Sequence, residues 1–139
     1  MYLLISTENN SHFSIAIGNK EIEKIKTVNK PYKQSEFLLK EVGKIIEPEN
    51  VKGIVVVEGP GQFSALRIGV VTANTLGFAL KKPIVGVKLM KSWLELIEKE
   101  KLQKVWTKGL VKLEGKKFGL NNLVKPYYDK EPNITVGRK

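Results

Sequence analysis

The chain has 139 residues and a formal net charge of +10, and it contains no cysteine. The absence of cysteine excludes disulfides, thiolate catalysis and cysteine-based zinc sites. His12 is the only histidine and Asp129 the only aspartate, so the ligand clusters of most hydrolytic metal sites cannot form except from glutamate. We therefore expect no metal site and no catalytic residues of a peptidase or an ATPase.

Three short strands are predicted at the start of the chain. Residues 2–6 form an apolar run, and residues 13–17 alternate between apolar and small side chains, as in a half-buried strand. Residues 21–28 alternate less regularly, which indicates an edge strand. Because Gly18 and Asn19 are typical of a tight turn, the pattern predicts a three-strand meander.

The pattern then changes to alternating helices and strands. Apolar side chains at intervals of three and four residues predict a helix over residues 34–46. A continuous β-branched run over residues 54–57 predicts a buried strand, and a helix over 62–80 and a strand over 84–87 follow. This order favours a mixed α/β sheet with helices packed on it.

Gly59, Pro60 and Gly61 end the buried strand and place bare backbone at the start of the second helix. Such a turn either holds an anion or lets another surface approach closely. The phosphate-binding pattern Gly-Lys-Ser/Thr is absent, because Gln62 and Phe63 follow Gly61, and the dinucleotide fingerprint lacks its third glycine. We therefore interpret the turn as a structural pivot.

The helix over residues 62–80 is apolar around most of its circumference, and Arg67 is its only charged residue. A helix of this kind is normally buried on two sides. In a chain of this size, we expect the second side to contact another protein; the alternative is that a C-terminal hairpin covers it. We expect Gly69→Glu or Leu76→Asp to abolish such binding while leaving the fold intact.

The last part of the chain is predicted to change character. Residues 91–101 have the pattern of an amphipathic helix, and residues 105–113 and 117–123 have that of a hairpin around Gly115. No repeat, low-complexity segment or linker separates these elements from the rest of the chain. We therefore expect one compact domain.

Most of the excess charge lies after residue 80, where fifteen basic and six acidic side chains occur. This asymmetry indicates a polyanionic or acidic partner, or only high solubility. The first case predicts a stand-alone RNA- or nucleotide-binding module, with Trp106 and Phe118 as stacking partners for bases. The residues expected to contact RNA are Lys104, Lys108, Lys112, Lys116 and Lys117.

The segment from Gly59 to Leu89 closely resembles the signature of the TsaB (YeaZ-like) family, whose pattern begins GPGSFTGLRIG. Residues 33–39 are similar to the start of a helix in that family, and residues 126–135 to its C-terminal segment. The resemblance implies an actin-like ATPase (RNase H-like) fold, a mixed β-sheet with helices packed on it. Residues 1–103 would form the N-terminal lobe, and residues 104–139 a second lobe reduced to a short β-hairpin and tail.

In this family, the protein is a non-catalytic scaffold in the synthesis of tRNA threonylcarbamoyladenosine (t6A). The resemblance implies that helices 34–46 and 62–80 pair with a TsaD-like catalytic subunit. A TsaE-like ATPase is a further implied partner, and tRNA is contacted through the complex. The implied partner-binding residues are Glu36, Leu39, Gly43, Ala65, Gly69, Thr72, Ala73 and Leu76. The residues of the motif turn are Gly59, Pro60, Gly61, Phe63 and Arg67.

Two departures from the family pattern bear on function. Ser6 stands where the family has an aspartate after the first strand, and Gln34 replaces a histidine at the start of the first helix. Because that aspartate is the superfamily's usual metal–phosphate ligand, we expect no cofactor, ATP included. We also expect a homodimer when the partner is absent, because large exposed apolar patches rarely stay bare. The N-terminus has no secretory pattern, so a cytoplasmic protein without membrane contact is expected.

Overall fold

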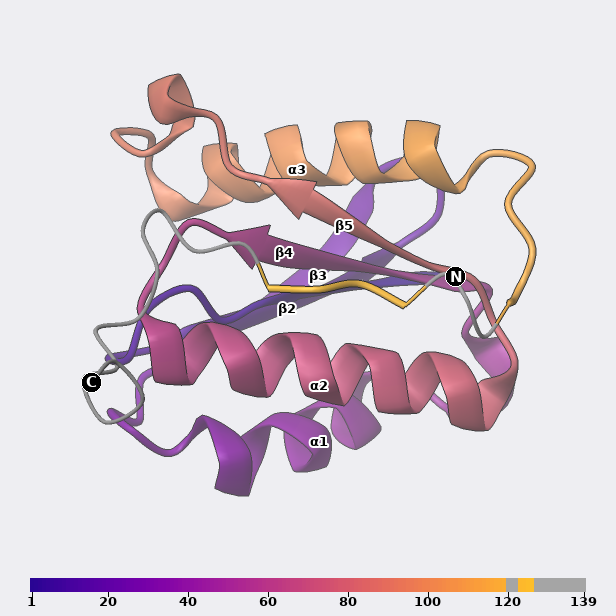
Figure 1. Ribbon diagram of the computed structural model, residues 1–139, viewed down its shortest axis with the longest axis horizontal. Helices are drawn as coiled ribbons and strands as arrows, with labels where there is room; N and C mark the ends of the chain where they lie inside the picture. The colour runs from indigo at the N-terminus through magenta and orange to yellow at the C-terminus, as the bar shows by residue number, and fades with distance from the viewer. Residues whose placement is uncertain (120–122, 127–139) are drawn as a thin grey trace, which may run out of the picture.

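A five-stranded mixed sheet forms the centre of the computed structural model, which describes residues 1–119 and 123–126 (Figure 1). Its strand order is β3-β2-β1-β4-β5. Strands β1 (Tyr2–Ser6), β2 (Phe13–Gly18) and β3 (Ile22–Val28) form the antiparallel meander that the sequence predicts.

The other two strands extend the sheet beyond β1. Strand β4 (Gly53–Gly59) pairs in parallel with β1, and β5 (Ile84–Lys88) pairs in parallel with β4. The β-branched residues of β4 point alternately to the two faces, with Ile54 and Val56 on one side and Val55 and Val57 on the other. Both faces of β4 are therefore buried, which explains its continuous apolar sequence.

Helices cover both faces of the sheet (Figure 1). Helices α1 (Gln34–Ile45) and α2 (Phe63–Leu80) lie side by side on one face, and α3 (Glu98–Leu113) crosses the other. Two short 3-10 helices, η1 (Pro48–Asn50) and η2 (Lys91–Trp93), lie in the connections. The molecule is thus a three-layer α/β sandwich, and its core is divided by the sheet into two apolar layers.

The sequence prediction was wrong for the segment after residue 91. Of the helix expected over residues 91–101, only η2 and the first turn of α3 form, and α3 continues through residues 105–113, where the first strand of a hairpin was expected. Residues 117–119 form no strand, and residues 120–122 of the expected second strand lie outside the described residues. Helix α3 also runs across position 103, where the sequence indicated the end of the N-terminal lobe.

Helix α3 has a glycine, Gly109, at its close approach to the sheet. The buried side chains of this helix, such as Leu102, Val105 and Trp106, follow a helical spacing, and Gly109 is buried on the same side. A Cβ on Gly109 would lie 2.5 Å from Val55 Cγ1 in β4. Glycine is therefore required by the close approach of α3 to the sheet, and it does not end the helix.

Helix α2 has 18 residues and a mean hydropathy of 1.4, which by length and composition alone is enough to cross a membrane. The core helix of a soluble protein has the same properties. Here α2 packs on β1 and β4, with Leu66 and Val70 buried against the sheet. Its apolar character is therefore explained in part by packing within the domain.

Candidate functional site

The glycine turn between β4 and α2 packs against the loop that follows β1. A Cβ on Gly61 would lie 2.5 Å from Glu8 Cβ and 2.6 Å from the Glu8 carbonyl oxygen, so no larger residue fits there. The Gln62 amide donates to that same carbonyl at 2.8 Å, and the Leu89 amide donates to the Gly59 carbonyl at 2.7 Å. The turn thus joins three segments of the chain, as expected of a structural pivot.

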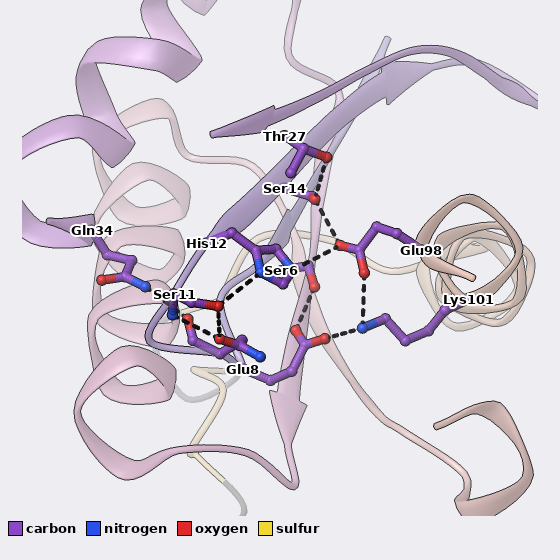
Figure 2. Close-up of polar contacts among 10 residues, drawn as sticks. Ser6, Glu8, Ser11, His12, Ser14, Thr27, Gln34, Glu98 and Lys101 are labelled. Carbon is purple, nitrogen blue, oxygen red and sulfur yellow. Dashed lines mark hydrogen bonds and ion pairs between the residues drawn. The ribbon is translucent and has the colours of Figure 1, made fainter. Parts of the chain in front are cut away.

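The loop after β1 carries a polar cluster that reaches across to α3 (Figure 2). Ser6 Oγ donates to Glu8 Oε1 at 2.5 Å, and the Glu8 carboxylate pairs with the ammonium of Lys101. Lys101 Nζ also lies 3.0 Å from Glu98 Oε1, and Ser14 Oγ donates to Glu98 Oε2 at 2.7 Å. We call these five residues the Lys101 cluster.

Two members of the Lys101 cluster have shifted pKa values. Burial alone would lower the pKa of Lys101, but the Glu8 and Glu98 carboxylates outweigh it and raise that pKa above its ordinary value. Burial alone would raise the pKa of Glu98, but the Ser14 hydrogen bond and the Lys101 charge outweigh it and lower that pKa. Lys101 and Glu98 are therefore both charged at neutral pH, which suits a structural ion-pair network better than proton transfer.

Ser6 stands where the family pattern has an aspartate, and its hydroxyl is used in a hydrogen bond within the chain. Ser6 is buried, and its hydroxyl donates to Glu8, whose carboxylate faces Lys101. Within the described part of the chain, no group of three or more His, Cys, Asp or Glu side chains is placed to hold a metal ion.

Helices α1 and α2 together present exposed apolar side chains on the outside of their layer. Leu39 of α1 is 58% exposed, and Val71 and Phe78 of α2 are 54% and 57% exposed. Glu36 and Gly43 are exposed about one turn on either side of Leu39, and nothing lies within 4 Å of a Cβ on Gly43. We call these five residues the α1–α2 face. It contains three of the predicted partner-binding residues.

Three of the α2 residues predicted to bind a partner are buried instead. Ala65, Gly69 and Ala73 are buried, and Thr7 Oγ1 at the end of β1 donates to the Ala65 carbonyl at 2.8 Å. A Cβ on Gly69 would overlap Thr7 Oγ1. The expectation that these three residues face a partner, and that Gly69→Glu leaves the fold intact, is therefore wrong. The small side chains let α2 approach the sheet.

The other α2 residues that the sequence singled out are half-buried or exposed. Thr72 and Leu76 are half-buried, and Leu76 packs against the core that includes Leu38 of α1. Phe63 and Arg67, from the motif turn, are exposed in the first turns of α2.

On the side of α2 that includes Val71, Asn74 exchanges hydrogen bonds with Val124 at 2.8 and 3.0 Å, and Phe78 packs near Phe118. The segment after α3 therefore lies along part of this side, as the alternative expected, while Val71, which the sequence did not single out, stays 54% exposed.

The lysines predicted to contact RNA lie on and after α3. Lys104 and Lys108 are exposed, and Lys112 Nζ donates to the Gly86 carbonyl at 2.5 Å. Trp106 is fully buried, and its indole N–H faces the Lys20 carbonyl at 3.3 Å, so its prediction as a stacking partner is wrong. Two further lysines, Lys116 and Lys117, are exposed beyond the helix. Phe118 lies 6.5 Å from Phe78, measured between ring centroids.

A family model described as "TsaD: tRNA N6-adenosine threonylcarbamoyltransferase" matches residues 33–104, more than half of the chain. The chain belongs to the TsaD family. The match runs from α1 into α3, and it includes the glycine turn and all of the α1–α2 face.

Two curated relatives in the TsaD family carry the same description, tRNA N6-adenosine threonylcarbamoyltransferase. The protein of Thermotoga neapolitana is 35% identical over 65 residues, and that of Koribacter versatilis is 36% identical over 55 residues. The alignments cover 47% and 40% of this chain, but 20% and 14% of the relatives. The chain therefore spans a fifth or less of the length of these relatives.

Among solved structures, YeaZ from Pseudomonas aeruginosa matches with a TM-score of 0.60 and 21% sequence identity. The match covers 71% of this chain and 49% of that one. It confirms the fold class that the sequence indicated, an actin-like (RNase H-like) lobe with a mixed sheet. At this identity the match shows the fold, which is also the fold that the resemblance to the TsaB (YeaZ-like) family implied.

Sequence reasoning missed the Lys101 cluster. Glu98 and Lys101 are three residues apart, a spacing that brings side chains together on a helix, but the sequence placed them in a helix that ended at Lys101. The pairing with Glu8 joins residues 93 positions apart, and no local pattern predicts it. Only the crossing of α3 over the sheet brings these residues together.

Proposed function

We propose that this chain is a non-catalytic partner subunit in tRNA t6A modification, which docks through the α1–α2 face onto a TsaD-like catalytic subunit. The observation that carries the proposal is the exposure of Leu39, Val71 and Phe78 on two adjacent helices in a member of the TsaD family. Exposed apolar residues grouped in this way are typical of protein–protein interfaces.

The rest of the proposal concerns chemistry and location. We further propose that the subunit is non-catalytic and binds no ATP and no other cofactor, because Ser6 stands where the family pattern has an aspartate and its hydroxyl donates to Glu8. A TsaE-like ATPase and tRNA join through the complex, in the cytoplasm. Free of its partner, the chain self-associates through the α1–α2 face, because the same apolar side chains then remain exposed to water.

Co-purification with a TsaD-like protein from the same host tests the proposal. Val71→Asp and Leu39→Asp each place a charge on the α1–α2 face, and burying such a charge without a partner is costly. We expect each variant to weaken binding at least tenfold, measured by calorimetric titration, with an unchanged circular dichroism spectrum.

The matched control is Val111→Asp. Val111 is an exposed valine of α3, 68% accessible, on the opposite face of the sheet. This variant carries the same chemical change away from the proposed interface, so its binding should match that of the unmodified chain. Equal loss in all three variants, or no loss in any, would remove the α1–α2 face from the proposal.

The alternative, a stand-alone RNA-binding module, rests on Lys104, Lys108 and the lysines that follow. Lys104 and Lys108 share one side of α3, at a spacing of four residues. Phosphate contacts of this kind weaken steeply as salt is added. A tRNA titration at low salt that leaves Lys104→Gln/Lys108→Gln and the unmodified chain indistinguishable would exclude it.

A further inference from the structure

A groove of about 720 Å³ runs along the outer side of α3. Trp93 and Leu96, from the segment before the helix, form one wall, and side chains of α3 from Glu100 to Val111 form the other. Val111 is 68% exposed at the far end of the groove, although it stands on a helix whose other side is buried against the sheet. This face lies in the layer opposite the α1–α2 face (Figure 1).

Charges along this side of α3 are arranged asymmetrically. Glu100 lies near the start of the groove, Lys104 in the middle, and Lys108 one further turn along. Lys108 Nζ lies 5.7 Å from the ring centroid of Trp93, so it is held beside the apolar wall. Glu100 and Lys108 are therefore about 12 Å apart along the helix axis, at 1.5 Å per residue.

We propose that a second copy of this chain fills the groove, with the two α3 helices packed antiparallel about a twofold axis near Lys104. A twofold interface uses the same patch on both copies, so each contact occurs twice. Antiparallel packing places Val111 of each copy against Leu96 of the other, beside the largely buried Trp93. It also sets Glu100 of each copy against Lys108 of the other, which pairs opposite charges twice.

The charges along α3 favour antiparallel over parallel packing of the two helices. Parallel packing would set Glu100 against Glu100 and Lys108 against Lys108, which is repulsive. In the antiparallel arrangement only Lys104 meets its own copy, and its long stem lets the ammonium reach solvent. The same packing covers Lys108, so RNA binding at this lysine and dimer formation exclude each other.

The test uses sedimentation equilibrium of chains that all carry Val71→Asp, which disables self-association through the α1–α2 face. We expect this background to form a concentration-dependent dimer. With Glu100→Lys added, positions 100 and 108 are both positive and repel each other across the dimer. With Lys108→Glu added, both positions are negative and also repel. Each variant alone should dimerise at least tenfold more weakly, as for the loss of close charge pairs at other interfaces.

Mixing the two variants is the decisive measurement. In an equimolar mixture, the Glu100→Lys copy presents two cations at the paired positions and the Lys108→Glu copy presents two anions, so a heterodimer of near-native affinity should form. Lys104→Gln, which removes the repulsion at the axis, should tighten the dimer. A monomeric Val71→Asp chain, or a mixture that stays as weakly associated as its components, would overturn the proposal. Circular dichroism of each variant excludes unfolding as the cause.

Discussion

The ammonium of Lys101 in α3 pairs with the carboxylate of Glu8 in the loop after β1 (Figure 2). The two residues are 93 positions apart in the sequence. Both side chains are largely buried, at 13% and 12% exposure. The pair links the helix on one face of the sheet to the loop that holds the glycine turn on the other. The position of α2 therefore depends on α3 through this loop.

Replacing Lys101 with methionine should destabilise the fold. The change leaves the largely buried Glu8 carboxylate and the partly buried Glu98 carboxylate without their cation, and breaking a buried pair in this way costs about 3 kcal/mol. Urea denaturation measures the loss as a lower midpoint with an unchanged slope. Lys99→Met is the matched control: Lys99 is exposed on the same helix, so a change within about 0.5 kcal/mol is expected. Equal stability of the two variants would contradict the role given to Lys101.

The stabilisation due to the Lys101 cluster should depend on pH at both ends of the range. The pKa of Lys101 is raised in the folded state, so its contribution is complete below about pH 10 and is lost as pH rises through the folded-state pKa. The pKa of Glu98 is lowered, so its contribution is present above about pH 4.3 and is lost as pH falls through the lowered pKa.

The measurement is the difference in unfolding free energy between the unmodified chain and Lys101→Met, followed against pH. We expect a plateau through neutral pH and a decrease toward both acid and alkaline conditions. A difference that does not change with pH would mean that Lys101 stabilises the fold by packing alone.

Two glycine-to-alanine changes should have opposite effects. A Cβ at Gly69 would overlap Thr7 Oγ1, so Gly69→Ala should cost about 1–3 kcal/mol as α2 is pushed from the sheet. A Cβ at Gly43 meets nothing within 4 Å, so Gly43→Ala should stabilise α1 by about 0.5–1 kcal/mol. Thermal melts of both variants give the comparison. Stabilisation by Gly69→Ala would show that Gly69 does not pack closely against Thr7.

The contact of Gly109 with Val55 is testable by a double-mutant cycle. Gly109→Ala alone should destabilise the chain by about 1–3 kcal/mol, because the new methyl group meets Val55 Cγ1 and Cγ2. Val55→Ala alone opens a small cavity. The double variant should be more stable than the sum of the two changes indicates, since the added methyl group fills the space that valine leaves. If the effects of the two single changes on the unfolding free energy simply add, Gly109 and Val55 are not in direct contact.

Much of the fold could be predicted from local patterns. The meander, the buried β4 and β5, and helices α1 and α2 follow from alternation, helical spacing and β-branched runs, each of which depends on a few neighbouring residues. Helix α3 was not predicted: the sequence indicated a helix that ended at Lys101 and a strand over residues 105–113, and local spacing does not show that Gly109 lies against Val55. The burial of Ala65, Gly69 and Ala73 was missed because their neighbours in the fold, such as Thr7 beside Gly69, are distant along the chain.

Local sequence was enough to establish the family-like glycine turn, the excess of basic residues after residue 80, and an α2 too apolar for one buried side. Which side of α2 is buried depends on packing. Ala65 and Gly69 face the sheet because small side chains allow the closest approach, and Val71 is left outside. The pairing of Lys101 with Glu8 likewise depends on the assembled fold, because the crossing of α3 over the sheet brings together charges that are distant along the chain.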